Sequence, residues 1–192
     1  MLRLPSEKGT ERSPVTPRNP TLQLKTTVQY QIIPGIQEVQ VEFDLDINIE
    51  RSPYIVFAFL RDKDTYPQED DSPVLLLERT TAGPPDVGTR YREIVQMLPF
   101  YKGEILSEIT HFEPGHRLDE DWQGPCMEGC LTYLFLPENG GTKLIQRETV
   151  NLCGLLWLLS PLIKLTLGSA LRRRLNDIKH ILESGWNPIE SS

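Results

Sequence analysis

Apolar and polar residues alternate without a break over residues 39–49, where the chain reads VQVEFDLDINI. Successive side chains of a β-strand point to opposite faces of the sheet, so this pattern predicts a strand with one buried and one solvent-exposed face. Ser52 and Pro53 follow. This pair is typical of a helix start, because Ser52 can accept hydrogen bonds from free amides and proline fits the first helical position. The segment therefore predicts a strand followed by a short helix.

Six further strand-like segments follow the polar loop KDTYPQEDD. The turn sequences AGPPDVG and PENGG are rich in glycine, proline, asparagine and aspartate, which suit tight turns between antiparallel strands. No helical pattern lies between these segments, so parallel βαβ units are excluded and the order predicts an antiparallel sheet covered on one face by helix. The predicted strands are residues 74–80, 88–98, 104–112, 117–122, 129–136 and 142–150.

The mostly apolar stretch of residues 152–174 resembles a membrane anchor at first sight. Its run without charge, residues 152–163, has only twelve residues, whereas a helix needs about twenty to cross a bilayer. Beyond Pro161, leucine and isoleucine recur at spacings of three and four residues as far as Leu182, while charged residues occupy the other faces. This spacing predicts an amphipathic C-terminal helix that ends near Gly185, and not a membrane span.

Charge and cysteine content narrow the classes of function. The formal net charge of −7 disfavours a nucleic-acid-binding surface, because such a surface needs a basic patch. Cys126, Cys130 and Cys153 cannot all pair, and neither zinc-site spacing nor a nucleotide-binding motif occurs. We therefore expect a cytoplasmic protein that uses no metal and no other cofactor. The sequence specifies no oligomeric state.

The chain of 192 residues fits a single globular domain with two tails. Residues 1–25 hold four prolines among polar residues and no continuous apolar run, which indicates an N-terminal tail rather than a signal peptide. We expect the domain to occupy residues 26–185 and a short C-terminal tail to occupy residues 186–192.

Four segments resemble, in order and spacing, motifs of one known family: INIERSPYIVFAFLRD, VGTRYRE, ITHFEPGHRL and LTYLFLPENGGTKL. Over residues 39–185 the chain resembles the START-like superfamily, also called helix-grip, Bet v 1-like or SRPBCC. Within it, the resemblance is to the polyketide cyclase/dehydrase and lipid-transport-like group. It implies an α+β fold in which a curved seven-stranded antiparallel sheet, with a short helix after its first strand, wraps around a long C-terminal helix and encloses a cavity. The N-terminal tail and the apolar LCGLLWLLSPLI depart from the family pattern.

A sheet that curves around one helix leaves apolar space between them, which is a natural site for a hydrophobic ligand. We therefore expect a carrier or sensor that binds a lipid, a quinone or a polyketide-like molecule. The expected lining is Phe59, Tyr91, Val95, Met97, Ile109, Leu131, Phe135, Leu144, Trp157, Leu167 and Leu171.

An alternative function is that of a cofactor-free cyclase or dehydratase. Its candidate acid–base residues, on the same strand faces, are Glu93, His111, Tyr133 and Glu148. An apolar cavity raises the pKa of a carboxyl, which can then hold or take a proton near neutral pH. A purely structural interpretation is also open. In that case His111 and Tyr133 serve the core, and Glu93 or Glu148 pairs on the outer face with Arg90, Arg92 or Arg147.

A further alternative concerns residues 152–163, whose apolar side chains could contact a membrane or a partner protein. The basic residues Arg172, Arg173 and Arg174 could meet anionic headgroups beside them, although three charges alone bind weakly and a solvated helix face is the simpler interpretation.

Overall fold

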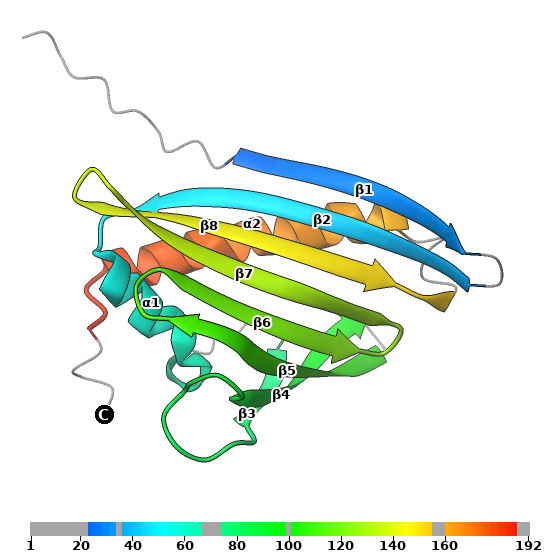
Figure 1. Ribbon diagram of the computed structural model, residues 1–192, viewed down its shortest axis with the longest axis horizontal. Helices are drawn as coiled ribbons and strands as arrows, with labels where there is room; N and C mark the ends of the chain where they lie inside the picture. Colours follow the sequence, from blue (N-terminus) through cyan, green and yellow to red (C-terminus); the bar gives the residue numbers. More distant parts are fainter. Residues whose placement is uncertain (1–22, 34–35, 67–73, 99–100, 155–159, 188–192) are drawn as a thin grey trace, which may run out of the picture.

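The computed structural model describes residues 23–33, 36–66, 74–98, 101–154 and 160–187 (Figure 1). Within them, eight antiparallel strands form one sheet in the order β1-β2-β8-β7-β6-β5-β4-β3. Figure 1 shows the long helix α2 running behind the curved sheet, with α1 near one end of it. The elements are β1 (Gln23–Ile33), β2 (Ile36–Ile49), α1 (Pro53–Arg61), the 3-10 helix η1 (Lys63–Thr65), β3 (Val74–Arg79), β4 (Arg90–Leu98), β5 (Tyr101–Glu113), β6 (Arg117–Gly124), β7 (Met127–Glu138), β8 (Gly141–Leu152) and α2 (Ser160–Glu183).

The predicted α+β architecture is confirmed, with one additional strand. β1 pairs along β2 from Gln23 opposite Asp46 to Ile33 opposite Ile36, so the sheet has eight strands and not the predicted seven. The first residues of β1 overlap the predicted N-terminal tail. The alternation VQYQI of residues 28–32 was a strand signal, but it is short and follows polar residues.

The short helix α1 begins where the sequence predicted, although its start is stabilised differently. The backbone carbonyl of Ser52 accepts hydrogen bonds from the amides of Ile55 and Val56 at 3.0 and 3.1 Å. The side chain of Ser52 makes no capping hydrogen bond, so the prediction for that hydroxyl is wrong. Pro53 at the start of the helix sets the local φ and removes one amide that would need a partner.

The core lies between the inner face of the sheet and the two helices. Alternate residues of β2 from Val39 to Ile49 are all buried, as the sequence predicted. From α2, Ile163 and Leu167 are half-buried, and the later residues of the apolar stripe are fully buried: Leu171, Leu175, Ile178 and Leu182. Both patterns therefore place their apolar residues in one shared core.

The C-terminal half of α2 is tied to the junction between β2 and α1. Lys179 donates a hydrogen bond to the carbonyl of Asn48, and the carboxylate of Glu183 accepts one from the amide of Glu50 at 2.8 Å. These contacts hold the C-terminal end of α2 against this junction. No helix among the described residues is long and apolar enough to cross a membrane.

Candidate functional site

The inner face of the sheet, which α2 covers, carries a group of polar and ionisable side chains among its apolar residues. They come from η1, from the strands β4 to β8 and from α2, so residues far apart in the sequence meet here. We call this group the inner polar cluster. Its members are Lys63, Glu93, Ser107, Glu120, Tyr133, Gln146, Glu148 and Arg174.

Lys63 joins three strands of the cluster. Its Nζ atom lies 3.0 Å from Glu93 Oε1 and 3.4 Å from Ser107 Oγ, and it also donates to Glu120 Oε1. Burial by itself would lower the pKa of Lys63, but the charges of Glu120 and Glu93 outweigh that effect and raise it. The ammonium group is therefore charged and neutralised by two carboxylates.

The packing of α1 holds Lys63 in this place. The ring of Phe57 meets Phe112 and Phe135 edge to face, with centroids 5.0 and 5.4 Å apart, which docks the helix on β5 and β7. The chain then turns through η1, and the hydroxyl of Tyr66 closes the turn by donating to a carbonyl of α1 at 3.0 Å. These contacts fix the position of the Lys63 side chain, which would be flexible in water, on the inner face of the sheet.

Glu148 is the carboxyl of the cluster whose pKa is raised. Burial raises that pKa to about 7, against the lowering effect of Arg174. Its Oε2 atom accepts a hydrogen bond from Gln146 Nε2 at 3.1 Å. A carboxyl whose pKa lies in this range can hold or release a proton near neutral pH, so it can act as an acid or as a base.

Two buried polar atoms of the cluster have no hydrogen-bond partner within the described part of the chain. They are the hydroxyl of Tyr133, a residue that is 3% exposed, and Oε1 of Gln146, a residue that is 0% exposed. Tyr133 and Gln146 lie directly opposite each other on β7 and β8, so their side chains share one face. A buried polar group left without a partner costs about 1–3 kcal/mol. The two atoms therefore mark one place on the inner face where a partner is needed.

Arg174 brings positive charge to this place from α2. Its neighbours Arg172 and Arg173 are exposed, whereas Arg174 is half-buried. Burial would raise the pKa of Glu93, but Lys63 and Arg174 together lower it, which shows how far the field of the arginine extends. Among the described residues, no carboxylate lies within ion-pair distance of Arg174.

Three of the four predicted acid–base residues, Glu93, Tyr133 and Glu148, lie on the inner face within this cluster. The alternative, in which the glutamates pair with arginines on the outer face, is wrong. Those arginines have other partners, in the pairs Arg90–Glu108, Arg92–Glu104 and Arg147–Asp44.

The prediction that His111 lies on the inner face of the sheet is wrong. The pairing of β5 with β6 shifts between Ile109 and His111, and such a β-bulge reverses the facing of the residues that follow. Ile109 is therefore buried, whereas the His111 side chain is 47% exposed and lies 3.7 Å from Glu113. Sequence alternation carries no signal for the extra residue, which is why this position was misassigned.

Most of the predicted apolar lining is on the inner side. Val95 and Leu167 are half-buried, which leaves part of each side chain accessible. Trp157 and the side chain of Met97 lie outside what the structure describes. The buried members are Phe59, Tyr91, Ile109, Leu131, Phe135, Leu144 and Leu171.

The sequence prediction missed three charged members of the cluster: Lys63, Glu120 and Arg174. Two of them had a signal. Glu120 alternates with Leu118 on β6, and Arg174 stands three residues after Leu171, on the apolar stripe of α2. Lys63 had none, because its position depends on how α1 docks.

Residues 152–163, the proposed contact for a membrane or a partner, are described only at their ends. Leu152 is fully buried in the core, whereas Leu162 is 58% exposed at the start of α2. The middle of the segment lies outside the described residues.

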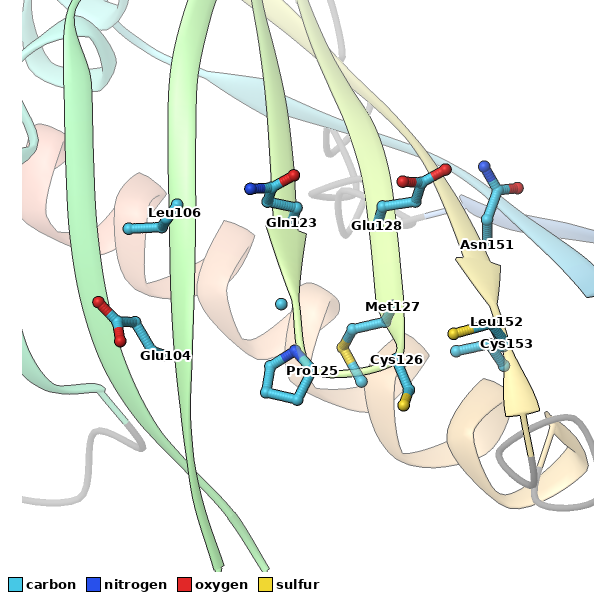
Figure 2. A pocket seen from close by; sticks show the side chains of 11 residues that line it. Glu104, Leu106, Gln123, Pro125, Cys126, Met127, Glu128, Asn151, Leu152 and Cys153 are labelled. Atoms are coloured by element: carbon cyan, nitrogen blue, oxygen red, sulfur yellow. The ribbon is translucent and has the colours of Figure 1, made fainter.

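A separate hollow of about 440 Å³ lies on the face of the sheet that points away from α2 (Figure 2). In Figure 2 the side chains of Leu106, Gln123 and Glu128 stand on the near side of the strands, with α2 behind them. Its carboxylate Glu104 is already paired with Arg92 at 2.6 Å.

Within the described residues, no three His, Cys, Asp or Glu side chains form a metal-binding group.

The sequence matches no protein-family model and no curated protein. Solved structures show the relationship instead. A START superfamily protein from Mycobacterium smegmatis is 14% identical, with a TM-score of 0.58 over 74% of this chain and 97% of that one. Ara h 8.0201 is 14% identical, with a TM-score of 0.57 over 76% of this chain and 99% of that one. A protein from Thermus thermophilus is 20% identical, with a TM-score of 0.62 over 79% of this chain and 99% of that one.

These similarities show that the chain has the START-like, helix-grip fold that its motifs predicted. At this level of identity they establish the fold alone.

Replacing Lys63 by methionine should leave Glu93 and Glu120 buried without their cation. We expect Lys63→Met to lower the free energy of unfolding by about 3–5 kcal/mol, and a second change, Glu120→Gln, to recover part of the loss. Urea unfolding measures both. Lys143, paired at 3.3 Å with Asp46 and partly exposed, is the matched control: Lys143→Met should cost less than about 1 kcal/mol. Equal losses for the two lysines would contradict the buried cluster.

The raised pKa of Glu148 predicts an unusual dependence of stability on pH. In the folded protein the carboxyl holds its proton up to about pH 7, whereas 4.5 is its ordinary value. Between pH 4.5 and 7 the folded state therefore binds more protons than the unfolded state. The contribution of Glu148 to stability is complete below about pH 4.5. It is lost as the pH rises through 7, by up to about 3 kcal/mol. Glu148→Gln should remove that slope in urea unfolding measured from pH 5 to 8, whereas Glu104→Gln on the outer face should keep it. An unchanged slope in Glu148→Gln would refute the assignment.

Proposed function

We propose that the protein binds a hydrophobic small molecule between the inner face of the sheet and α2, as a carrier or sensor. A lipid, a quinone or a polyketide-like molecule would fit this description. The fold supports the proposal, because START-like and Bet v 1-like proteins typically bind hydrophobic ligands.

One observation carries the proposal: the hydroxyl of Tyr133 and Oε1 of Gln146 are buried side by side without partners among the described residues. A core that served only stability would place apolar groups at both positions, since an unpaired polar group destabilises the folded state. The polar end of a ligand that reaches this place can accept a hydrogen bond from the Tyr133 hydroxyl, which removes the cost of leaving that group unpaired. We infer that the pair is kept for binding.

The surroundings suit a molecule with a long apolar body and one polar end. Leu131, Phe135 and Leu144 lie on the same strand faces as the unpaired atoms and are buried. Ligand sites of this kind are mostly apolar, with a few polar groups that fix orientation. The apolar residues would hold the body of the ligand, and the cluster would hold its polar end.

Native mass spectrometry of gently purified protein should detect a co-purifying apolar molecule, and an apo mass in repeated preparations would count against binding. Tyr133→Phe separates binding from packing. Without ligand it should raise the free energy of unfolding by about 1 kcal/mol or more, because the unpaired hydroxyl is gone. It should also weaken binding of the fluorescent probe 1-anilinonaphthalene-8-sulfonate about two- to tenfold. Tyr54→Phe, which alters an exposed tyrosine, should change neither.

A second function, cofactor-free acid–base catalysis of the cyclase or dehydratase type, is supported by one specific feature. Glu148 is a buried carboxyl with a pKa of about 7, beside Tyr133 and Arg174. A group with such a pKa transfers protons efficiently at neutral pH. His111 has no part in this proposal because it faces outward.

The substrate 5-nitrobenzisoxazole, whose ring opens when a carboxylate removes its carbon-bound proton, tests this second function. We expect the rate with the protein to rise with pH through about 7 and to fall at least tenfold in Glu148→Gln. The control is Glu104→Gln, which removes an exposed carboxylate. Equal rates of ring opening for Glu148→Gln and Glu104→Gln would rule out Glu148 as the base.

A further inference from the structure

We infer that the ligand of the proposed site is an amphiphilic acid, whose ionised oxygen is bound by Arg174 and Tyr133. This inference rests on the proposed function and specifies the chemistry of the polar end of the ligand.

The two cations of the inner polar cluster differ in their partners. Lys63 contacts both Glu93 and Glu120 and is only 10% exposed at its side chain, so it has no capacity left for a ligand. Arg174 is half-buried, and no described carboxylate lies within 4.0 Å of it. Burial raises the pKa of Tyr133 and of Tyr66, and the charge of Arg174 acts against that effect at both hydroxyls. Arg174 is therefore the cation to which an anion can add.

Among the described residues, the hydrogen bonds of Arg174 leave some of its N–H groups available for a ligand. The hydroxyl of Tyr66 donates to a carbonyl of α1 and accepts from Arg174, which accounts for one of the five N–H groups of a guanidinium. Guanidinium groups bind planar oxyanions such as carboxylates with two parallel hydrogen bonds. Tyr133, close to Arg174 and without a partner in the described part of the chain, supplies a further O–H donor for the same oxygen.

The groups around Glu148 determine how pH acts on such a ligand. Arg174 faces it from α2, Tyr133 from β7, Glu120 from β6 and Lys63 from η1. On its own strand it contacts Gln146, and β2 presents only the apolar Phe43 opposite it.

A carboxylate bound at Arg174 would repel an ionised Glu148, so the two cannot both carry charge without loss of affinity. Binding of the acid therefore favours the protonated form of Glu148, whose O–H can donate to the ligand. Affinity for an acid should fall as the pH rises through 7, and affinity for a neutral ligand should change less.

Isothermal titration calorimetry with decanoate, 1-decanol and decylammonium tests the inference, because the three probes share one apolar chain and differ only in the end group. A carboxylic acid of this type is ionised from about pH 6 to 8. We expect decanoate to bind at least tenfold more tightly than either other probe at pH 6, and its affinity to fall about tenfold from pH 6 to pH 8, as expected for one group with a pKa of about 7. In Glu148→Gln the decanoate affinity should be the same at both pH values.

Arg174→Met should weaken decanoate at least tenfold and 1-decanol less than threefold, whereas Arg173→Met, an exposed neighbour on the same helix, should change neither. If Arg174→Met fails to fold by circular dichroism, Tyr133→Phe, which keeps the shape of the ring, takes its place and should weaken decanoate more than 1-decanol. Equal binding of all three probes, or tightest binding of decylammonium, overturns the inference and leaves the proposed function standing. No binding of any probe overturns both.

Discussion

The structure depends on how the buried charges on the inner face of the sheet compensate one another. Lys63, Glu93 and Glu120 come from three different elements and meet where water is largely excluded. Removing charges from water costs several kcal/mol for each ion, and only close contact with opposite charge offsets that cost. The docking of α1, which carries Lys63 to the carboxylates, is thus coupled to the positions of β4 and β6. The contacts of Lys63, Glu93 and Glu120 therefore form or separate together, as one unit.

The cluster has two parts with different properties. Around Lys63 the charges are matched and the hydrogen bonds are made. Around Tyr133, Gln146 and Glu148 they are not, because two atoms lack a partner among the described residues and the carboxyl has a pKa of about 7. The first part orders the inner face, and the second part is available for chemistry or binding. Arg174 acts on both parts, because its charge opposes the effect of burial on the pKa of Glu93 and on that of Glu148.

The fold could be predicted from the sequence because most of its elements follow simple periodicity. The two-residue period of β2 and the spacing of leucines in α2 each specify a buried face, and turn residues separate the strands. β1 was missed because its alternating part is short. The motifs then pointed to the START-like fold, which the solved structures confirm.

The candidate site could be predicted only in part, for a physical reason. The alternation of side chains along regular strands correctly predicted that Glu93, Tyr133 and Glu148 lie on the inner face. The β-bulge in β5 turns His111 to the outer face, and no local sequence pattern predicts a bulge. Arg174 and Glu120 occupy apolar positions in their patterns. A charged residue at a position where the pattern calls for an apolar one is a useful indication of a buried functional site.

The most direct measurement is an NMR titration of the side-chain carboxyl carbons in the ligand-free protein. The account predicts that Glu148 titrates near pH 7, while Glu93 titrates below the ordinary range of a glutamate. A Glu148 carboxyl that titrates near 4.5, its ordinary value, would show that the inner face is open to water, and would contradict the existence of a buried site beneath α2.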